Sequence, residues 1–264
     1  MTARRTSTPR RPSQLDYVGL LGQWISRDFR SRYRRSSLRA VWAVLQPVLT
    51  VATYAFIFGV IFSQSGGELP YLAYLLAGMT VYRIVASALG SITCLVDNAD
   101  LIGHSHFPRE IVPLSMVFGN GMDTLIMALG LIVVAQVQGI GFHITLVALP
   151  LVLSSAVVLA CALCIIGSTV QVFVRDLEFI MTFVLMALFF ASPITYQPDQ
   201  LPAQLQWLNS VNPISVDVQA VRDTALLGSW PSALFSLHLA LAVALLAAAV
   251  AHLRAVQHRI VDLG

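Results

Sequence analysis

Long apolar runs alternate with short polar segments along most of the chain, and this pattern predicts a bundle of membrane-spanning helices. A helix rises about 1.5 Å per residue, so about 20 apolar residues cross about 30 Å of hydrocarbon. Six runs approach or exceed this length, and they cover residues 40–62, 71–96, 114–137, 144–173, 179–196 and 233–253. The predicted fold is therefore an all-α membrane protein with six transmembrane helices.

Residues 15–39, ahead of the first run, show a different pattern. Apolar side chains recur every four positions while Gln23 and several arginines collect on the opposite side, the apolar set being Tyr17, Leu21, Ile25, Phe29 and Tyr33. This spacing is typical of an amphipathic helix that lies in the membrane surface. The first 14 residues are rich in Arg, Ser, Thr and Pro and predict a disordered tail. The chain thus divides into a tail (1–14), an interface helix (15–39) and one six-span domain (40–264).

The polar segment 97–113 lies between the second and third apolar runs, and the sequence from Asn98 to Leu114 reads NADLIGHSHFPREIVPL. Asn98 or Asp100 can cap a short helix here, and Pro108 ends it. We expect this helix to dock against a partner protein, because charged groups are costly in hydrocarbon unless they are paired. A solvated loop is the alternative interpretation.

A second unusual segment, residues 197–231, separates the fifth and sixth runs. Prolines punctuate it, but Leu201, Leu205 and Leu208 keep a helical spacing. We expect short re-entrant helices that form a gate region on the outer face.

The amino-acid composition restricts the possible functions more than it restricts the predicted fold. Hydrophobic residues make up 57% of the 264 residues and charged residues only 11%, against about 25% charged in soluble domains. All 16 basic residues are arginines, so the lysine of a P-loop cannot be present. The chain therefore lacks a standard ATPase site of its own. We find no GxSxG or HExxH motif, and we expect no catalytic residue, no resident cofactor and no bound metal.

The arginines also indicate the orientation. Ten of them lie in the first 39 residues, and the predicted loops and tail on the same side hold Arg109, Arg175, Arg254 and Arg259. Only Arg222 falls on the other side. The positive-inside rule then places both termini in the cytoplasm.

Arg83 in the second span and Asp123 in the third are charges within apolar runs. Counted from the loop between them, both lie about 15 to 20 Å deep. A helical hairpin brings them together, so we expect an intramembrane ion pair. The alternative is that one or both face a polar conduit.

Aromatic side chains gather on the first and fifth spans. Aromatic faces pack against the C–H groups of sugars without fixed hydrogen bonds, so these residues are candidates for the wall of a glycan path: Tyr54, Phe58, Phe62, Phe183, Phe189, Phe190 and Tyr196. Packing between helices or against lipid is the alternative role for each of them.

Four segments resemble those of one family: RDFRSRYRRSSLRAVWAVLQP (27–47), NADLIGHSHFPREIVPL, VRDLEFI (174–180) and FFASPITY (189–196). They are similar to the permease subunit of ABC-2 type exporters that move polysaccharides or polyol phosphates, such as O-antigen, teichoic acid and capsule. The chain departs from that pattern at Arg39, where the family usually has Gly, and at Val81 and Tyr82, where Pro and Trp are common.

The resemblance implies a homodimer in the cytoplasmic (inner) membrane of a bacterium, bound to two copies of a separate ABC ATPase that holds ATP and Mg. It implies a lipid-linked glycan as substrate, contact with membrane lipids and no nucleic acid. The implied ATPase-coupling residues are Asn98, Asp100, Leu101, Ile102, His104, His106, Phe107, Arg109, Glu110, Arg175 and Asp176. Those implied to bind the anionic lipid headgroup are Arg27, Arg30, Arg34 and Arg35.

Three other functions remain open from the sequence. An ABC-2 permease can also export drugs or small amphiphiles. An ion-coupled secondary transporter would need broken helices and acidic groups at mid-membrane, and Asp123 is the one deep acid expected here. An intramembrane enzyme would have to use His104, His106 and Glu110, which match no known catalytic arrangement.

Overall fold

The computed structural model describes residues 14–33, 39–99 and 108–261, and within these ranges it forms helices and no strand. The predicted disordered tail lies almost entirely outside the described residues. Helix α1 (Gln14–Tyr33) covers most of the predicted interface helix. The all-helical fold class expected from the hydrophobic pattern is confirmed.

Five helical stretches among the described residues are long and apolar enough to cross a membrane, namely Val44–Ile61, Tyr71–Leu89, Ile111–Val137, Ile144–Phe173 and Ala233–Val256. They agree with five of the six predicted spans. The remaining predicted span corresponds to α9 (Leu177–Ala191), which has only 15 residues. The chain is thus a multi-pass membrane protein with five or six spanning helices.

Two of the spans are irregular in ways that hydropathy does not reveal. Helix α2 (Arg39–Tyr54) continues into η1 (Ala55–Ile61), a π-helix. Gly59 lies against the ring of Tyr71, where a Cβ atom would come within 2.8 Å of Cδ1, so a larger residue would separate η1 from α3. The third predicted span consists of α6 (Ile111–Gly119) and α7 (Gly121–Val137), which are interrupted at Asn120.

The remaining elements follow the predicted order. The second span is α3 (Tyr71–Leu89), followed by the short α4 (Cys94–Asp97). The fourth is η2 (Ile144–Ala148) with α8 (Leu149–Phe173), and the last is α12 (Ala233–Val261). The predicted gate region holds η3 (Pro198–Gln200), η4 (Ala203–Leu205), α10 (Leu208–Val211) and α11 (Pro213–Ala225).

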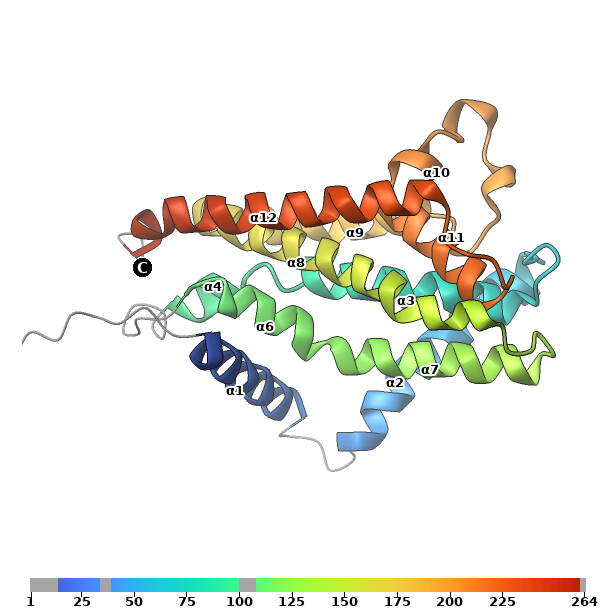
Figure 1. Ribbon diagram of the computed structural model, residues 1–264, viewed down its shortest axis with the longest axis horizontal. Coiled ribbons are helices and arrows are strands. Elements are labelled where there is room, and N and C mark those ends of the chain that lie inside the picture. Colours follow the sequence, from blue (N-terminus) through green and yellow to red (C-terminus); the bar gives the residue numbers. More distant parts are fainter. Residues whose placement is uncertain (1–13, 34–38, 100–107, 262–264) are drawn as a thin grey trace, which may run out of the picture.

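Helices α3 and α8 form the centre of the bundle. Helix α3 contacts α7, α8 and α11, and α12 runs along α8 (Figure 1). Small buried residues such as Ala77 of α3 and Ala156 and Ala160 of α8 let the central helices approach closely, as is usual in membrane bundles. By contrast, η1 has no buried residue, and Phe189 is the one buried residue of α9.

Figure 1 shows that the bundle has two distinct ends. Helices α1 and α4 and the end of α12 lie at one end, which we term the proximal end. Helices α10 and α11 lie at the other, which we term the distal end. The predicted coupling and gate segments therefore lie at opposite ends of the molecule.

Candidate functional sites

At the proximal end, Glu110 at the start of α6 meets Arg254 near the end of α12. Nε of Arg254 donates a hydrogen bond of 2.9 Å to Oε1 of Glu110, and Nη2 donates to the same oxygen. The Glu110 side chain is only 3% exposed, whereas that of Arg254 is 61% exposed. A carboxylate buried without a cationic partner is strongly destabilising. The ion pair therefore fixes the start of α6 to α12.

A second contact fixes α1 to the end of α4. Nη2 of Arg27 donates a hydrogen bond of 2.6 Å to Oδ1 of Asn98, and Nδ2 of Asn98 donates to the carbonyl of Cys94 at 2.8 Å. The Arg27 guanidinium also lies 4.4 Å from the centre of the Trp24 ring, a favourable cation–π distance. Asn98 and Glu110 thus anchor both sides of segment 100–107.

A small apolar cluster lies beneath these two contacts. It joins α4, α6, α8 and α12 through Cys94, Leu95, Val112, Ile165, Ala249 and Leu253, and Trp24 of α1 packs against it. Because these side chains are closely packed, displacement of α4 or of the start of α6 is transmitted to the other helices. We call these six residues the proximal cluster.

The structure places only some of the predicted coupling residues. Asp100, Leu101, Ile102, His104, His106 and Phe107 lie outside the described residues, as do Arg34 and Arg35 of the predicted headgroup set. Arg30 belongs to α1.

Burial lowers the pKa of Arg109. Arg175 and Asp176 are exposed in the turn before α9, and the Arg175 carbonyl accepts a hydrogen bond of 2.9 Å from Gln171.

The predicted intramembrane charges lie close together. Nη2 of Arg83 is 3.7 Å from Oδ2 of Asp123, and the two side chains are 28% and 27% exposed. They line a cavity of 460 Å³ together with polar side chains that include Gln46, Ser87 and Asn120. The pair and the polar cavity, which the sequence offered as alternatives, thus occur at one place. The contribution of the Arg83–Asp123 ion pair to stability stays a prediction.

At the distal end, the bend after α9 is held by tyrosines of α3. The hydroxyl of Tyr71 donates to the carbonyl of Thr195 at 3.0 Å, and that of Tyr74 donates to the carbonyl of Tyr196 at 2.7 Å. Asn212, which caps α11 through the amide of Ile214, also donates to Ser192 Oγ at 2.9 Å. These bonds tie the segment FFASPITY, recognised in the sequence, to the centre of the bundle.

The side chain of Arg222, on α11, also contacts this bend and is 1% exposed. Its Nη2 donates to the carbonyl of Pro193 at 2.7 Å, and its guanidinium lies 3.4 Å from the centre of the Tyr74 ring. Among the described residues, Nε and Nη1 have no hydrogen-bond partner. Burial lowers the pKa of Arg222 to about 10, so the side chain stays cationic near neutral pH.

Sequence reasoning placed Arg222 outside the membrane and gave it no role. A signal was present, because Arg222 shares the apolar face of α11 with Ile214, Val218, Val221 and Ala225, all buried. A lone cation on an apolar helix face indicates a buried role. The Glu110–Arg254 contact was missed for another reason, since the two residues are 144 positions apart.

Asp217 of α11 is a second buried charge that the sequence did not single out. It is 2% exposed, and its Oδ1 accepts a hydrogen bond of 3.0 Å from Ser155 of α8. Burial raises the pKa of Asp217 to about 7, while the Ser155 hydroxyl acts in the opposite direction. The folded protein therefore favours the protonated carboxyl.

This pKa predicts a pH-dependent stability. Because the folded state binds the Asp217 proton more tightly than the unfolded state, stability is greatest at low pH and is lost as pH rises toward 7. Replacing Asp217 by Asn is expected to remove on the order of 3 kcal/mol of this dependence between pH 5 and 8. Thermal unfolding in detergent across that range tests it, and Ser155→Ala should steepen the dependence. An unchanged slope in Asp217→Asn would contradict the assignment.

The predicted glycan-path aromatics form a series of ring contacts between α2, η1 and α9. Ring centres lie 6.1 Å apart for Tyr54 and Phe58, 5.0 Å for Tyr54 and Phe189, and 5.2 Å for Phe189 and Phe190. Phe62 continues the series from Phe58 at 5.7 Å, and the Tyr196 hydroxyl donates to the Phe190 carbonyl. Phe189 is buried, whereas Phe62, Phe183 and Phe190 are more than half exposed. Phe189 therefore packs between helices, and the exposed rings are those able to contact a substrate.

Comparison with known proteins agrees with this architecture. The profile of the family described as ABC-2 type transporter matches residues 20–226. The chain is 30% identical over 207 residues to the O-antigen export system permease protein RfbA of Klebsiella pneumoniae, covering 77% of this chain and 79% of that protein. It is 29% identical to RfbA of Myxococcus xanthus, over 68% and 69% of the two chains. It is 24% identical to the polysialic acid transport protein KpsM of Escherichia coli, over 76% and 79%.

Proposed function

Because the chain belongs to the ABC-2 type transporter family, we propose that it is the membrane subunit of an ATP-driven exporter of a lipid-linked polysaccharide. The similar proteins of Klebsiella pneumoniae and Escherichia coli are named for O-antigen export and polysialic acid transport. Their coverage of most of the chain supports a cell-envelope glycan as the cargo. ATP and Mg would bind a separate ABC ATPase, present in two copies.

The double anchoring of segment 100–107 is the observation that best supports ATPase coupling. Asn98 on one side is bonded to Arg27 of α1, and Glu110 on the other side is bonded to Arg254 of α12. A partner that moves this segment therefore acts on both helices and on the proximal cluster. We propose that segment 97–113 is the coupling segment, with Arg175 and Asp176 as a second contact.

The export path is proposed to form between two copies of the chain. Most of the described side chains of α2 and α9 are exposed and none in η1 is buried, which supports a homodimer that joins along these elements. The exposed aromatic rings Phe62, Phe183 and Phe190 would then contact the moving glycan. The bend held by Arg222, together with α10 and α11, would form the gate at the distal end.

The proposed topology has six spans, with α9 as the short fifth span and α1 in the membrane surface. The proximal end carries α1, whose sequence includes Arg27, Arg30 and Arg32, and Arg254 of α12, which supports its placement in the cytoplasm. The protein would thus lie in the bacterial inner membrane with both termini inside. Arg27, Arg30, Arg34 and Arg35 would meet the anionic headgroup of the lipid-linked glycan there.

Co-purification with an ABC ATPase of the same organism tests the proposal. We expect a stable complex in lipid nanodiscs, whose ATP hydrolysis rises when the lipid-linked glycan of the same organism is added. A complex with an ATPase variant that cannot hydrolyse ATP serves as the control for background hydrolysis. Failure to bind any ABC ATPase would overturn the proposal. Stimulation by small amphiphiles alone would reassign the cargo to drugs or related compounds.

A further inference from the structure

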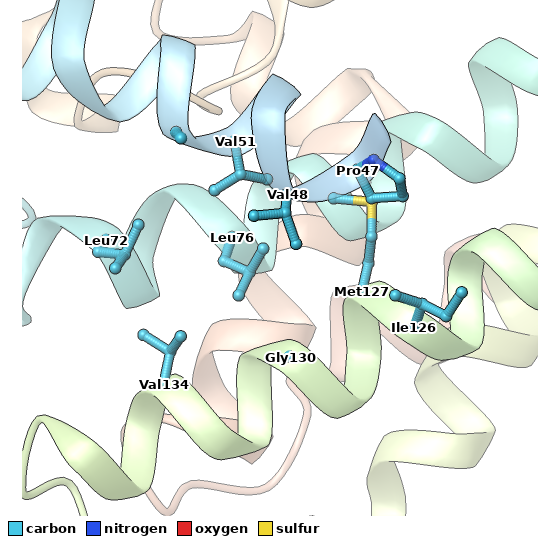
Figure 2. A pocket seen from close by; sticks show the side chains of 10 residues that line it. Pro47, Val48, Val51, Leu72, Leu76, Ile126, Met127, Gly130 and Val134 are labelled. Carbon is cyan, nitrogen blue, oxygen red and sulfur yellow. The ribbon is translucent and has the colours of Figure 1, made fainter. Parts of the chain in front are cut away.

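A seam between α2 and α7 contains an apolar cleft of 230 Å³. Figure 2 shows Pro47, Val48 and Val51 of α2 facing α7, with side chains of α3 beside them. On α7 the wall is formed by Met127, Gly130 and Val134. The absence of a side chain at Gly130 leaves room for an extended apolar group at this point.

The polar cavity described above continues this seam toward the proximal end. It is lined by Gln46, the residue before Pro47, and by Asp123, which lies one turn before Met127. Arg83 of α3 lies opposite Asp123 in the same cavity. The seam is therefore amphiphilic, with a polar half of 460 Å³ and an apolar half of 230 Å³.

The order of the two halves matches the orientation of a lipid in the proximal leaflet, with the polar half nearer the proximal end. From Asp123 to Val137, the distal end of α7, the helix rises about 21 Å. A hydrocarbon core of about 30 Å then leaves about 10 Å on the proximal side of Asp123. The polar half thus lies in the proximal leaflet, and the apolar half extends from the membrane centre near Met127 into the distal leaflet at Val134. A lipid of that leaflet has the same orientation.

The charges in the polar half select the headgroup. The cavity holds one cation, Arg83, and one anion, Asp123, and both side chains keep more than a quarter of their surface exposed. Their 3.7 Å separation exceeds hydrogen-bond length, so each group retains bonding capacity. A guanidinium suits a phosphate, and a carboxylate suits an ammonium group. A purely anionic headgroup would meet repulsion from Asp123.

We propose that this seam binds a zwitterionic phospholipid that carries a phosphate and a primary ammonium group. The phosphate contacts Arg83, the ammonium group contacts Asp123, and one acyl chain lies along the cleft beside Gly130. The site is separate from the aromatic path between α2 and α9, and it does not depend on the identity of the exported cargo.

Native mass spectrometry of the full chain tests the headgroup assignment. The protein is reconstituted in vesicles with equal amounts of phosphatidylethanolamine and phosphatidylglycerol and is then released in mild detergent. We expect retained phosphatidylethanolamine to exceed phosphatidylglycerol by about three- to tenfold, the factor that one ordinary hydrogen bond typically gives. Asp123→Asn should abolish or reverse this preference. Arg83→Gln should lower retention of both lipids.

A second pair of variants tests the apolar half without changing any charge. Gly130→Leu places a side chain in the cleft and should reduce retained lipid several-fold, since a Cβ atom at Gly130 itself meets nothing closer than 3.8 Å. Val133→Leu, at a position 61% exposed on the same helix, should leave it unchanged. An Asp123→Asn protein that is folded and keeps the wild-type lipid ratio would overturn the proposal. So would preferential retention of phosphatidylglycerol or of a pyrophosphate-linked lipid by the wild type.

Discussion

Arg222→Ala is expected to destabilise the fold by about 3–5 kcal/mol and to abolish export. The substitution removes a fully buried side chain and leaves a cavity between α11 and α3. It also leaves the carbonyl of Pro193 without the hydrogen bond that Arg222 donates. Because this carbonyl lies in the bend after α9, the bend loses its attachment to the middle of α11 and keeps only the one at the cap residue Asn212. Thermal unfolding of the purified chain in detergent and glycan export in cells measure the two effects.

Two further variants separate a local effect from general damage to the distal end. Gln219→Ala, on the exposed side of the same helix, removes only one exposed hydrogen bond and should stay within about 0.5 kcal/mol of the wild type. Tyr74→Phe keeps the ring beneath the guanidinium but loses the bond to the Tyr196 carbonyl, at a cost of about 1–2 kcal/mol. If Arg222→Ala unfolded at the wild-type temperature, Arg222 would not be the residue that holds the bend.

Much of this fold was predictable because lipid permits few backbone arrangements. Hydrocarbon requires every backbone polar group to be satisfied within the chain, so long apolar runs must be helices. That rule gave five of the spans and the order of elements. It could not give the break at Asn120 or the π-helix η1, because both depend on how neighbouring helices pack. Nor could it predict that α9 would have only 15 helical residues, since the apolar pattern continues through the bend.

The candidate sites, like the fold, could be predicted from the sequence only in part. Arg83 and Asp123 were identifiable because charges in apolar runs are rare and are usually paired. Arg222 and Asp217 were not recognised, because their segment carries prolines and polar residues that hide the apolar face of α11 on which Arg222 lies. Glu110 was recognised within a polar segment, but its partner Arg254 lies on the last helix. Contacts between such distant positions follow from the tertiary fold and leave no local pattern in one sequence.

The Glu110–Arg254 pair leads to the other prediction of large effect, in which the two partners behave differently. Arg254→Ala leaves the 3% exposed carboxylate of Glu110 without a counter-charge and should destabilise the fold by about 2–4 kcal/mol. Glu110→Ala leaves Arg254, whose side chain is 61% exposed, able to turn toward water and should cost less stability. Both variants detach α6 from α12, so both should uncouple ATP hydrolysis from transport. Thermal unfolding and the number of glycans exported per ATP are the two measurements.

The double variant Glu110→Ala/Arg254→Ala distinguishes burial of a charge from loss of contact. Because it removes the buried carboxylate together with its partner, it should be more stable than Arg254→Ala alone, yet it should remain uncoupled. Glu68→Ala, at an exposed acidic position in the loop between η1 and α3, is the matched control and should retain both properties. Equal losses of stability in the two single variants would mean that the Glu110 carboxylate is not buried as described. Normal coupling in the double variant would mean that α12 does not take part in transmitting the motion of the coupling segment.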